Sequence, residues 1–347
     1  GDHRDLHSFP TRRSSDLLCR TEHMFFQEER LPIVQKVILS EPGSEVETRE
    51  LDKLLHFQYD DFYGIFKAMA GYPVIIRLID PPLHEFMPDH EQLAMRATGL
   101  RILGDRPNEL NRIETMMKAV EGLQEFNPML GFRGVRIGVI RPAINAMQVR
   151  AILMAACQLT SEGVDVKPEI MIPLASHVNE VKSVKVLINR IAQEVMDEYG
   201  CEVAYQVGTM IELPRACITA GELAQEAEFF SFGTNDLTQT TFGISRDDAE
   251  SKFLLDYVEK GILPQNPFQV IDETGVGYLI DLAAKRGRAT RPELSLGICG
   301  EHGGEPQSIA FCNKVGLDYV SCSPFRVPIA RLASAQAALL GDGFTAK

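Results

Sequence analysis

The fold is decided by residues 208–215, Gly-Thr-Met-Ile-Glu-Leu-Pro-Arg, in which a short apolar strand stops on the carboxylate of Glu212. Residues 230–238, Phe-Ser-Phe-Gly-Thr-Asn-Asp-Leu-Thr, repeat this arrangement with Asp236. Because removing an ionised carboxylate from water costs several kcal/mol, two such acids predict one divalent cation that both of them bind. Strand-end acids that pair with Arg or Lys would give the same pattern, so the sequence alone leaves both readings open.

Five further apolar runs extend the pattern in both directions along the chain. They end near Arg20, Arg77, Pro173, Cys299 and Ser323. Between the runs lie segments with helical spacing, such as residues 178–199, in which Val or Ile recurs every three or four positions. This alternation is typical of parallel strands joined by helices. Polar residues follow nearly every strand, which favours a parallel (β/α) barrel over an open doubly wound sheet.

Composition narrows the classes of function. A chain of 347 residues with 45% hydrophobic residues can bury a substantial core. Its formal net charge of -13 argues against nucleic-acid binding, and no apolar run approaches the roughly 20 residues of a membrane helix. The seven cysteines include no Cys-x-x-Cys pair and lie mostly among apolar residues. We therefore expect small, buried thiols in a reducing cytoplasm or organelle stroma.

Residues 1–17 differ from the rest of the chain. Arg, Asp and His crowd around a Ser-Ser pair without any helical or strand period, and the apolar core of a secretory signal is missing. Arg and Ser are typical of transit peptides, but the acidic residues oppose that reading. We expect a junction-derived leader at 1–17, outside the fold, and a barrel at 18–347. Seven strands imply a barrel without its first strand and with an exposed edge, unless the leader takes that place.

Several motifs indicate a family. Besides the two segments above, they are Leu-Cys-Arg-Thr-Glu-His-Met-Phe-Phe at 18–26, Arg-Leu-Ile-Asp-Pro-Pro-Leu-His-Glu-Phe at 77–86, Gly-Phe-Arg-Gly at 131–134 and Gly-Ile-Cys-Gly-Glu-His-Gly-Gly at 297–304. Over about residues 18–340 the chain closely resembles the phosphoenolpyruvate/pyruvate-binding barrel of the pyruvate, phosphate dikinase family. Phosphoenolpyruvate synthase and enzyme I of the sugar phosphotransferase system are similar in the Gly-Thr-Asn-Asp and Arg-Thr-Glu segments. Residues 81–86 and 300–304 are more like the dikinase.

The resemblance implies an α/β fold, a (β/α)8 TIM-type barrel that binds Mg²⁺ and phosphoenolpyruvate or pyruvate. Whole enzymes of this family interconvert ATP, phosphate and pyruvate with AMP, diphosphate and phosphoenolpyruvate. They carry a nucleotide-grasp domain and a swivelling phosphohistidine domain before the barrel, and the sequence contains neither a Gly-rich ATP-binding region nor a Thr-Ser-His-Ala-type segment. We therefore expect a fragment that performs only pyruvate enolisation and phosphoryl acceptance. Its implied partners are the substrate, the phosphohistidine domain of the parent enzyme and a second copy in a homodimer.

The resemblance also implies the metal and substrate-binding residues at the two opening segments. Glu212 and Asp236 match the family's magnesium ligands. Magnesium takes one or two carboxylates and completes its octahedral shell with water and substrate oxygens. Gly233, Thr234 and Asn235 match the family's substrate-binding turn, where backbone N–H groups and the Asn amide can point at substrate oxygens. Read alone, the same four residues are also a good turn and helix-cap sequence.

Three arginines complete the implied binding residues. Arg20 and Arg77 match the family's catalytic arginines, and their guanidinium forks suit carboxylate and phosphoryl oxygens. Arg133, between two glycines, matches a further substrate-binding residue. For Arg20 and Arg77 the alternative is structural, since a buried Arg is commonly tied to an acid, here Asp80 or Glu22 across the barrel mouth.

Cys299 matches the family's proton donor to the substrate methyl carbon, which makes it a catalytic residue by resemblance. A nearby cation and arginines are expected to lower the pKa of its thiol. His302, in the same loop, could orient Cys299 or Glu301, but it is expected to face solvent and is given no role. Two other functions stay open: an enzyme of the phosphoenolpyruvate synthase or enzyme I branch, and a non-catalytic ligand-binding barrel. The implied location is the cytoplasm, with plastid and glycosome as alternatives.

Overall fold

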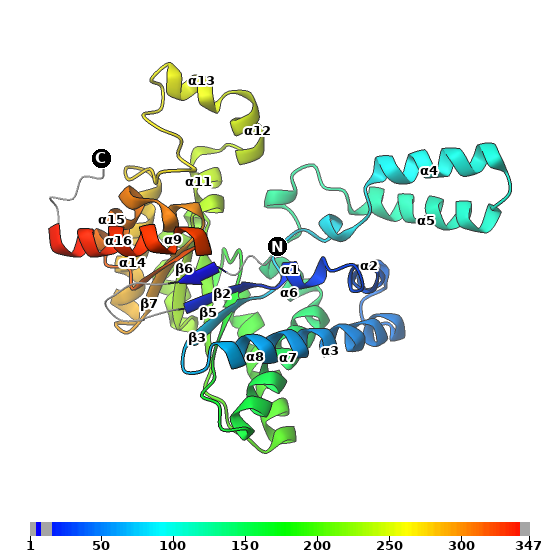
Figure 1. Cartoon of the computed structure of the whole chain (residues 1–347), viewed down its shortest axis with the longest axis horizontal. Coiled ribbons are helices and arrows are strands. Elements are labelled where there is room, and N and C mark those ends of the chain that lie inside the picture. The colour runs from blue at the N-terminus through cyan, green and yellow to red at the C-terminus, as the bar shows by residue number, and fades with distance from the viewer. Residues whose placement is uncertain (1–4, 8–15, 341–347) are drawn as a thin grey trace.

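The protein is described by a computed structural model that covers the backbone of residues 5–7 and 16–340, with side chains from residue 18 onward (Figure 1). The described residues form eight strands in one closed barrel, in which strands adjacent in the chain are adjacent in the barrel. Seven of them run parallel: β2 (Asp16–Arg20), β3 (Pro73–Arg77), β4 (Lys167–Ile172), β5 (Gln206–Ile211), β6 (Phe229–Gly233), β7 (Ser295–Cys299) and β8 (Tyr319–Cys322). These are the seven predicted strands, so the (β/α) barrel is confirmed.

The eighth strand, β1 (Asp5–His7), comes from the segment that the sequence places outside the fold. It pairs antiparallel with β2 and β8, so that Leu6 lies opposite both Leu17 and Cys322. The expected exposed edge is therefore closed. A short extended segment such as β1 can do this because it supplies hydrogen-bond partners to the free N–H and C=O groups of β2 and β8. The rest of the predicted leader, residues 1–4 and 8–15, lies outside the described residues.

Helices cover the outer face of the barrel. One or more of them follow each parallel strand, and the main covering helices are α3 (Glu45–Ala68), α7 (Pro142–Ser161), α8 (Val178–Tyr199), α10 (Ala220–Glu226), α14 (Val276–Thr290), α15 (Pro306–Val315) and α16 (Val327–Leu340). The bounds of α8 coincide with the predicted helix. A capping box of His177 and Glu180 begins it, and Gly200, with a φ of 61°, ends it, as the left-handed conformation favours glycine.

Two excursions leave the barrel on the side where the parallel strands end. The longer one is a hairpin of α4 (His90–Leu103) and α5 (Pro107–Leu123), which projects far from the barrel in Figure 1 and has a small core of its own around Leu100 and Ile113. The other contains α12 (Arg246–Lys252) and α13 (Leu254–Glu259). The shorter helices are α1 (Glu22–Phe25), α2 (Leu31–Leu39), η1 (Leu83–Phe86), η2 (Pro128–Leu130), α6 (Val135–Ile140), α9 (Pro214–Ile218), α11 (Thr234–Phe242), η3 (Glu301–Gly304) and η4 (Pro324–Arg326).

The barrel core needs glycine where aromatic rings cross a neighbouring strand. A Cβ on Gly297 of β7 would lie 2.0 Å from Cζ of Tyr319 on β8, and one on Gly208 of β5 would lie 2.4 Å from Cγ of Phe229 on β6. Both rings are fully buried. Two large rings thus fill the barrel layers because the adjacent strand has no side chain there.

The cysteines differ in part from the expectation. Five of them, Cys19, Cys217, Cys299, Cys312 and Cys322, are buried and carry no disulfide. Cys157 of α7 instead forms a disulfide with Cys201, which lies just after the end of the neighbouring helix α8. Spacing along the chain could not reveal this pair, since helix packing brings the two residues together. Among the described helices, none combines the length and the apolar character that a membrane span requires.

Candidate active site at the carboxyl ends of the strands

The parallel strands end at a cavity of about 250 Å³. Eight of the nine predicted site residues line it: Arg20, Arg77, Glu212, Gly233, Thr234, Asn235, Asp236 and Cys299. They come from five strand ends, as the barrel fold places them. The ninth, Arg133, is not among the lining residues but forms an ion pair with one of them, Asp236. The structure thus brings the predicted residues together, while their functional roles stay predictions.

Glu212 follows β5 and is 1% exposed. Its Oε1 accepts a hydrogen bond of 2.6 Å from the backbone N–H of Leu174. Burial raises the pKa of Glu212 well above its ordinary value, and the negative charges of Asp236 and Asp80 raise it further. Three acids therefore lie close enough to repel one another across the barrel mouth, which is the charge arrangement that a cation would relieve.

The backbone around Glu212 is built to hold its carboxylate. Leu174 has a φ of 56°, a left-handed conformation that costs energy for a residue with a side chain, and it presents the N–H that Glu212 accepts. On the other side, a Cβ on Gly233 would lie 2.4 Å from Glu212 Oε2. Glycine is therefore needed at position 233 on steric grounds, since any side chain there would displace the carboxylate, while its predicted part in substrate binding stays a prediction.

The arginines form a buried ion-pair network centred on Asp80. Arg77 pairs with Glu22 and, through Nη1, with Asp80 Oδ2 at 2.8 Å. Arg133 Nη2 lies 2.8 Å from the same Oδ2, and its Nη1 lies 3.1 Å from Asp236 Oδ1. Burial alone would raise the pKa of Asp80, but Arg77, Arg133 and Arg20 hold it below its ordinary value. The pairing of Arg77 with Asp80 and Glu22 that the structural alternative expects is thus present, and Asp236 is paired with an arginine as well.

Sequence reasoning named Asp80 only as a possible structural partner and missed its central position. The available signal was its place directly after β3, inside a quoted motif. Arg77 still lines the cavity although it is paired, so its guanidinium can contact a ligand there.

Cys299, the last residue of β7, is 4% exposed and its Sγ lies 3.6 Å from the carbonyl oxygen of Phe232. The arginines alone do not lower the pKa of the thiol as expected, while the effect of a bound cation stays a prediction. Burial raises the pKa of the thiol, and although Arg20, a hydrogen bond with Ser231 and Arg77 all act in the opposite direction, burial outweighs them. The thiol is therefore protonated near neutral pH.

His302 lies in η3 and is fully buried, so the expectation that it faces solvent is wrong. Its Nδ1 lies 2.7 Å from Thr234 Oγ1 and its Nε2 lies 3.0 Å from the carbonyl oxygen of Pro267. The missed signal is the pair of glycines that follows it: a Cβ on Gly303 would lie 2.0 Å from the carbonyl oxygen of Ser321, so this loop packs tightly against β8.

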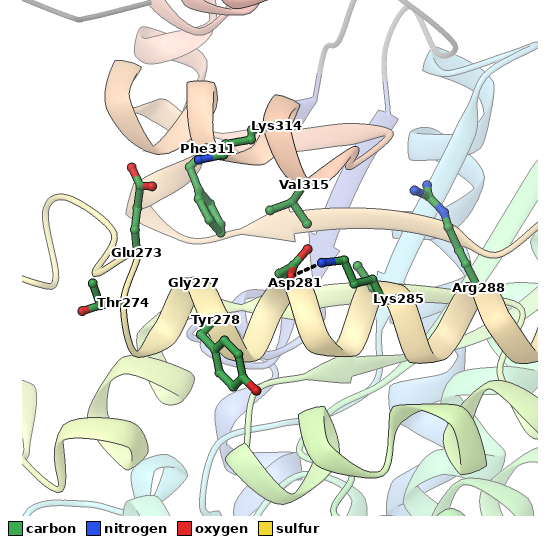
Figure 2. Close-up of a pocket in the computed structure, with 11 residues that line it drawn as sticks. Glu273, Thr274, Gly277, Tyr278, Asp281, Lys285, Arg288, Phe311, Lys314 and Val315 are labelled. Atoms are coloured by element: carbon green, nitrogen blue, oxygen red, sulfur yellow. Dashed lines mark hydrogen bonds and ion pairs between the residues drawn. The ribbon is translucent and has the colours of Figure 1, made fainter. Parts of the chain in front are cut away.

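A larger hollow of about 760 Å³ lies on the outside of the barrel, between α14 and α15 (Figure 2). In it, Lys285 pairs with Asp281 at 2.6 Å, and Phe311 of α15 faces the α14 side. It contains none of the predicted site residues and no convergent buried charges. The smaller cavity at the strand ends is therefore the candidate active site, since chemistry depends on placed charges rather than on volume.

The donor set restricts which metal could bind. Among the described residues, no three His, Cys, Asp or Glu side chains cluster as a metal site. Zinc-type sites need three or four protein ligands, whereas magnesium is held by one or two carboxylates with water and substrate oxygens. Glu212 and Asp236, with their mutual repulsion, therefore fit magnesium and not a structural zinc.

Comparison with known proteins agrees with this geometry. The family model described as PEP-utilising enzyme, PEP-binding domain, matches residues 17–339. A pyruvate, phosphate dikinase of Giardia intestinalis is 54% identical over 322 residues, which are 93% of this chain and 35% of that protein. One from Clostridium symbiosum is 53% identical over 325 residues, 93% of this chain and 36% of that protein. A chloroplastic one from Mesembryanthemum crystallinum is 54% identical over 322 residues, 92% of this chain and 33% of that protein.

The chain thus spans about a third of the length of the curated relatives it matches. Among solved structures, a citrate lyase from Burkholderia xenovorans aligns at 18% identity over 55% of this chain and 54% of that chain, with a TM-score of 0.37. That likeness is too weak to carry any argument.

Proposed function

The chain belongs to the family of PEP-utilising enzymes, whose PEP-binding domain it matches, and from this premise we propose that it binds phosphoenolpyruvate and pyruvate at the strand-end cavity. We propose further that it carries the pyruvate enolisation and phosphoryl-acceptance half of the pyruvate, phosphate dikinase reaction, with Mg²⁺. The observation that carries the proposal is the convergence of Glu212, Asp236, Arg20, Arg77 and Cys299 on one cavity.

The charges in the cavity suit an enolate. Taking a methyl proton from pyruvate leaves negative charge on an oxygen. Fixed positive charges near that oxygen lower the free energy of forming the enolate. Arg20 and Arg77 supply guanidinium groups at the cavity wall. Asn235 Oδ1 has no hydrogen-bond partner among the described residues, so it can accept a hydrogen bond from a water or a ligand donor. The two guanidinium groups would bind and orient the substrate carboxylate and phosphoryl group.

Glu212 and Asp236 would hold the Mg²⁺, which when bound supplies a Lewis acid next to the developing charge. The fit rests on the repulsion between these acids, which together with burial raises the pKa of Glu212. Leu174 and Gly233 keep the Glu212 carboxylate in one position.

Cys299 suits a proton donor because its raised pKa keeps the thiol protonated near neutral pH. In the direction of pyruvate formation, the S–H bond breaks, the proton joins the methylene carbon of the enolate, and a thiolate remains. Arg20 and Arg77 lower the thiol pKa and therefore stabilise that thiolate. In the reverse direction the C–H bond breaks and the methyl proton joins the sulfur of the thiolate. Because the raised pKa leaves only a small thiolate fraction near neutral pH, this direction should be slow.

The complete reaction depends on parts that lie outside this chain. We propose a phosphohistidine domain as the phosphoryl donor and a homodimer as the assembly. The cytoplasm is proposed as the location, and a plastid is a second candidate because several relatives are named as chloroplastic. Phosphoenolpyruvate synthase, enzyme I and a non-catalytic barrel stay as alternatives to be tested.

The test is deuterium exchange into the methyl group of pyruvate, followed by proton NMR with and without Mg²⁺. We expect slow, magnesium-dependent exchange that falls by at least about 100-fold in Cys299→Ala, the usual range for losing an acid-base group. Cys312→Ala, which removes a buried thiol of α15 away from the cavity, is the matched control. Unchanged exchange in Cys299→Ala would remove that residue from its role. If the wild type shows no exchange and calorimetry shows no phosphoenolpyruvate binding with Mg²⁺, the barrel is inert.

A further inference from the structure

We propose that His302 is a positioning residue for the half-reaction proposed above, on which this inference rests. Its Nδ1 accepts a hydrogen bond from the Thr234 hydroxyl. This bond joins the turn that carries the proton donor Cys299 to the turn that carries Asn235 and Asp236. The sequence motif allowed an orienting role for this histidine but gave it no partner at Thr234, and His302 does not line the cavity itself.

His302 connects three segments that are far apart in the chain. It lies in η3, directly after the Cys299 turn, and its Nδ1 is 2.7 Å from the hydroxyl of Thr234, the first residue of α11. Its Nε2 is 3.0 Å from the carbonyl oxygen of Pro267, in the segment between α13 and α14. His302 and Thr234 are both fully buried, so water does not compete for these hydrogen bonds.

The partners decide which ring nitrogen carries hydrogen. The carbonyl of Pro267 can only accept, so Nε2 must donate to it. Burial lowers the pKa of His302, and Arg246 acts in the same direction, while the hydrogen bond to Pro267 and the charges of Glu305 and Glu301 oppose this. The neutral ring therefore carries its single hydrogen on Nε2 and leaves Nδ1 as an acceptor.

The tautomer of His302 determines to which acceptor the Thr234 hydroxyl donates its hydrogen bond. That hydroxyl has one proton and two acceptors within reach, His302 Nδ1 at 2.7 Å and the carbonyl oxygen of Cys299 at 3.2 Å. With Nδ1 unprotonated, the proton goes to the shorter contact. Thr234 then offers only lone pairs to the cavity that it lines, so it can accept from a ligand or a water but cannot donate.

Steric contacts make the connection stiff. Gly300, which follows Cys299, has a φ of 113°, and a Cβ there would lie 2.9 Å from Thr234 Oγ1 and 3.5 Å from Asn235 Oδ1. The Cys299 turn thus rests directly on the residue that His302 holds. A shift of the Thr234 side chain would move the proton donor relative to the substrate-binding turn, and misplacement by about 1 Å can cost roughly 100-fold in rate.

The first measurement addresses the hydrogen bonds without any activity. In protein labelled with ¹⁵N-histidine, we expect a pyridine-type signal for Nδ1 of His302 and a pyrrole-type signal for Nε2 throughout the neutral pH range. The His302→Asn spectrum assigns the signals by their loss. Hydrogen on both nitrogens, or on Nδ1 alone, overturns the proposal.

The second measurement uses variants that separate the two hydrogen bonds. His302→Asn keeps an acceptor near Thr234, since Asn Oδ1 takes the place of Nδ1, whereas His302→Gln keeps a donor toward Pro267. In pyruvate deuterium exchange we expect Thr234→Val and His302→Gln to lower kcat by about 10- to 100-fold with less than about threefold change in KM. We expect His302→Asn and Thr234→Ser to retain most of the rate.

The double variant decides between coupling and coincidence. Thr234→Val with His302→Gln should be no slower than the slower single variant, because both remove one hydrogen bond. Multiplying losses, or equal losses in His302→Asn and His302→Gln, would refute the positioning role. If the wild type itself shows no exchange, the proposed function fails. The His302–Thr234 hydrogen bond is then tested without activity, in two ways. The ¹⁵N signals report which ring nitrogen carries hydrogen, and the thermal unfolding midpoints of the two single variants and the double variant report whether the two residues are coupled.

Discussion

Removing the charge of Asp80 should destabilise the fold more than any exposed ion pair can. Asp80→Asn preserves the size of the side chain but leaves Arg77 and Arg133, both nearly buried, without the carboxylate that they share at 2.8 Å. Breaking a buried ion pair from one side typically costs about 3–5 kcal/mol, because it leaves an uncompensated charge in the interior.

The structure places the expected loss at the lower end of that range. Arg77 retains Glu22, and Arg133 retains Asp236 at 3.1 Å, so neither guanidinium becomes unpaired. The substitution also removes part of the repulsion that raises the pKa of Glu212. We therefore expect the free energy of unfolding to fall by about 3 kcal/mol at neutral pH.

The loss should also depend on pH in a defined direction. The pKa of Asp80 in the folded protein lies below its ordinary value of 3.8. A carboxyl group with a lowered folded pKa stabilises the fold above its unfolded pKa, and this stabilisation is lost as the pH falls through the folded pKa. The difference between wild type and Asp80→Asn should thus be constant near neutral pH and shrink below 3.8.

Urea unfolding followed by circular dichroism measures this difference. The matched control is Asp281→Asn, which breaks the 2.6 Å pair with Lys285 on the surface of α14 and should change stability by no more than about 0.5 kcal/mol. A loss below about 1 kcal/mol in Asp80→Asn, or a difference that grows toward acid pH, would contradict the central role of Asp80.

Three further predictions follow from the packing and the thiols. Gly297→Ala should lower the thermal unfolding midpoint, because the new Cβ would clash with the Tyr319 ring at a cost of roughly 1–3 kcal/mol. The control is Gly64→Ala in α3, where a Cβ meets nothing within 4 Å, and it should leave the midpoint equal or higher. Equal midpoints for both variants would contradict the packing argument. Gly233→Ala should weaken calorimetric phosphoenolpyruvate binding in the presence of Mg²⁺ by about tenfold or more, because its Cβ would displace Glu212 Oε2, and an unchanged affinity would speak against that carboxylate as a ligand. Denatured protein should show five thiols before reduction and seven after it, and seven thiols before reduction would count against the disulfide. In native protein the labelling rate of Cys299 should rise only above pH 9.0, the ordinary pKa of a thiol, and fast labelling near neutral pH would count against the raised pKa.

Strand positions could be predicted well because they depend on local pattern. A buried strand needs a short apolar run, and the polar residue that ends it marks the barrel mouth, as at Arg20, Arg77 and Cys299. The same reasoning located α8 to the residue, because its apolar face repeats at helical spacing. It allowed for a strand from residues 1–17 but could not place β1, since three residues are too few to carry a pattern and gain their place only from the two strands beside them.

The residues of the candidate site could be named from the motifs, but their states could not. Whether Cys299 has a raised or a lowered pKa depends on the balance between burial and the charges of Arg20 and Arg77, which come from other strands. The burial of His302 depends on how closely η3 approaches β8. Gly303 permits this close approach, but a glycine in the sequence does not by itself predict it.

The sequence by itself determined the order of strands and helices, the residues at the strand ends and the likeness to one family. Each of these depends only on residues that are close together in the chain. Only the tertiary structure decided which charges meet. Arg133 and Asp236 are 103 positions apart, and Asp80 gathers two arginines from different segments. The free energy of a charge depends on its surroundings in space, and a linear pattern does not contain those surroundings.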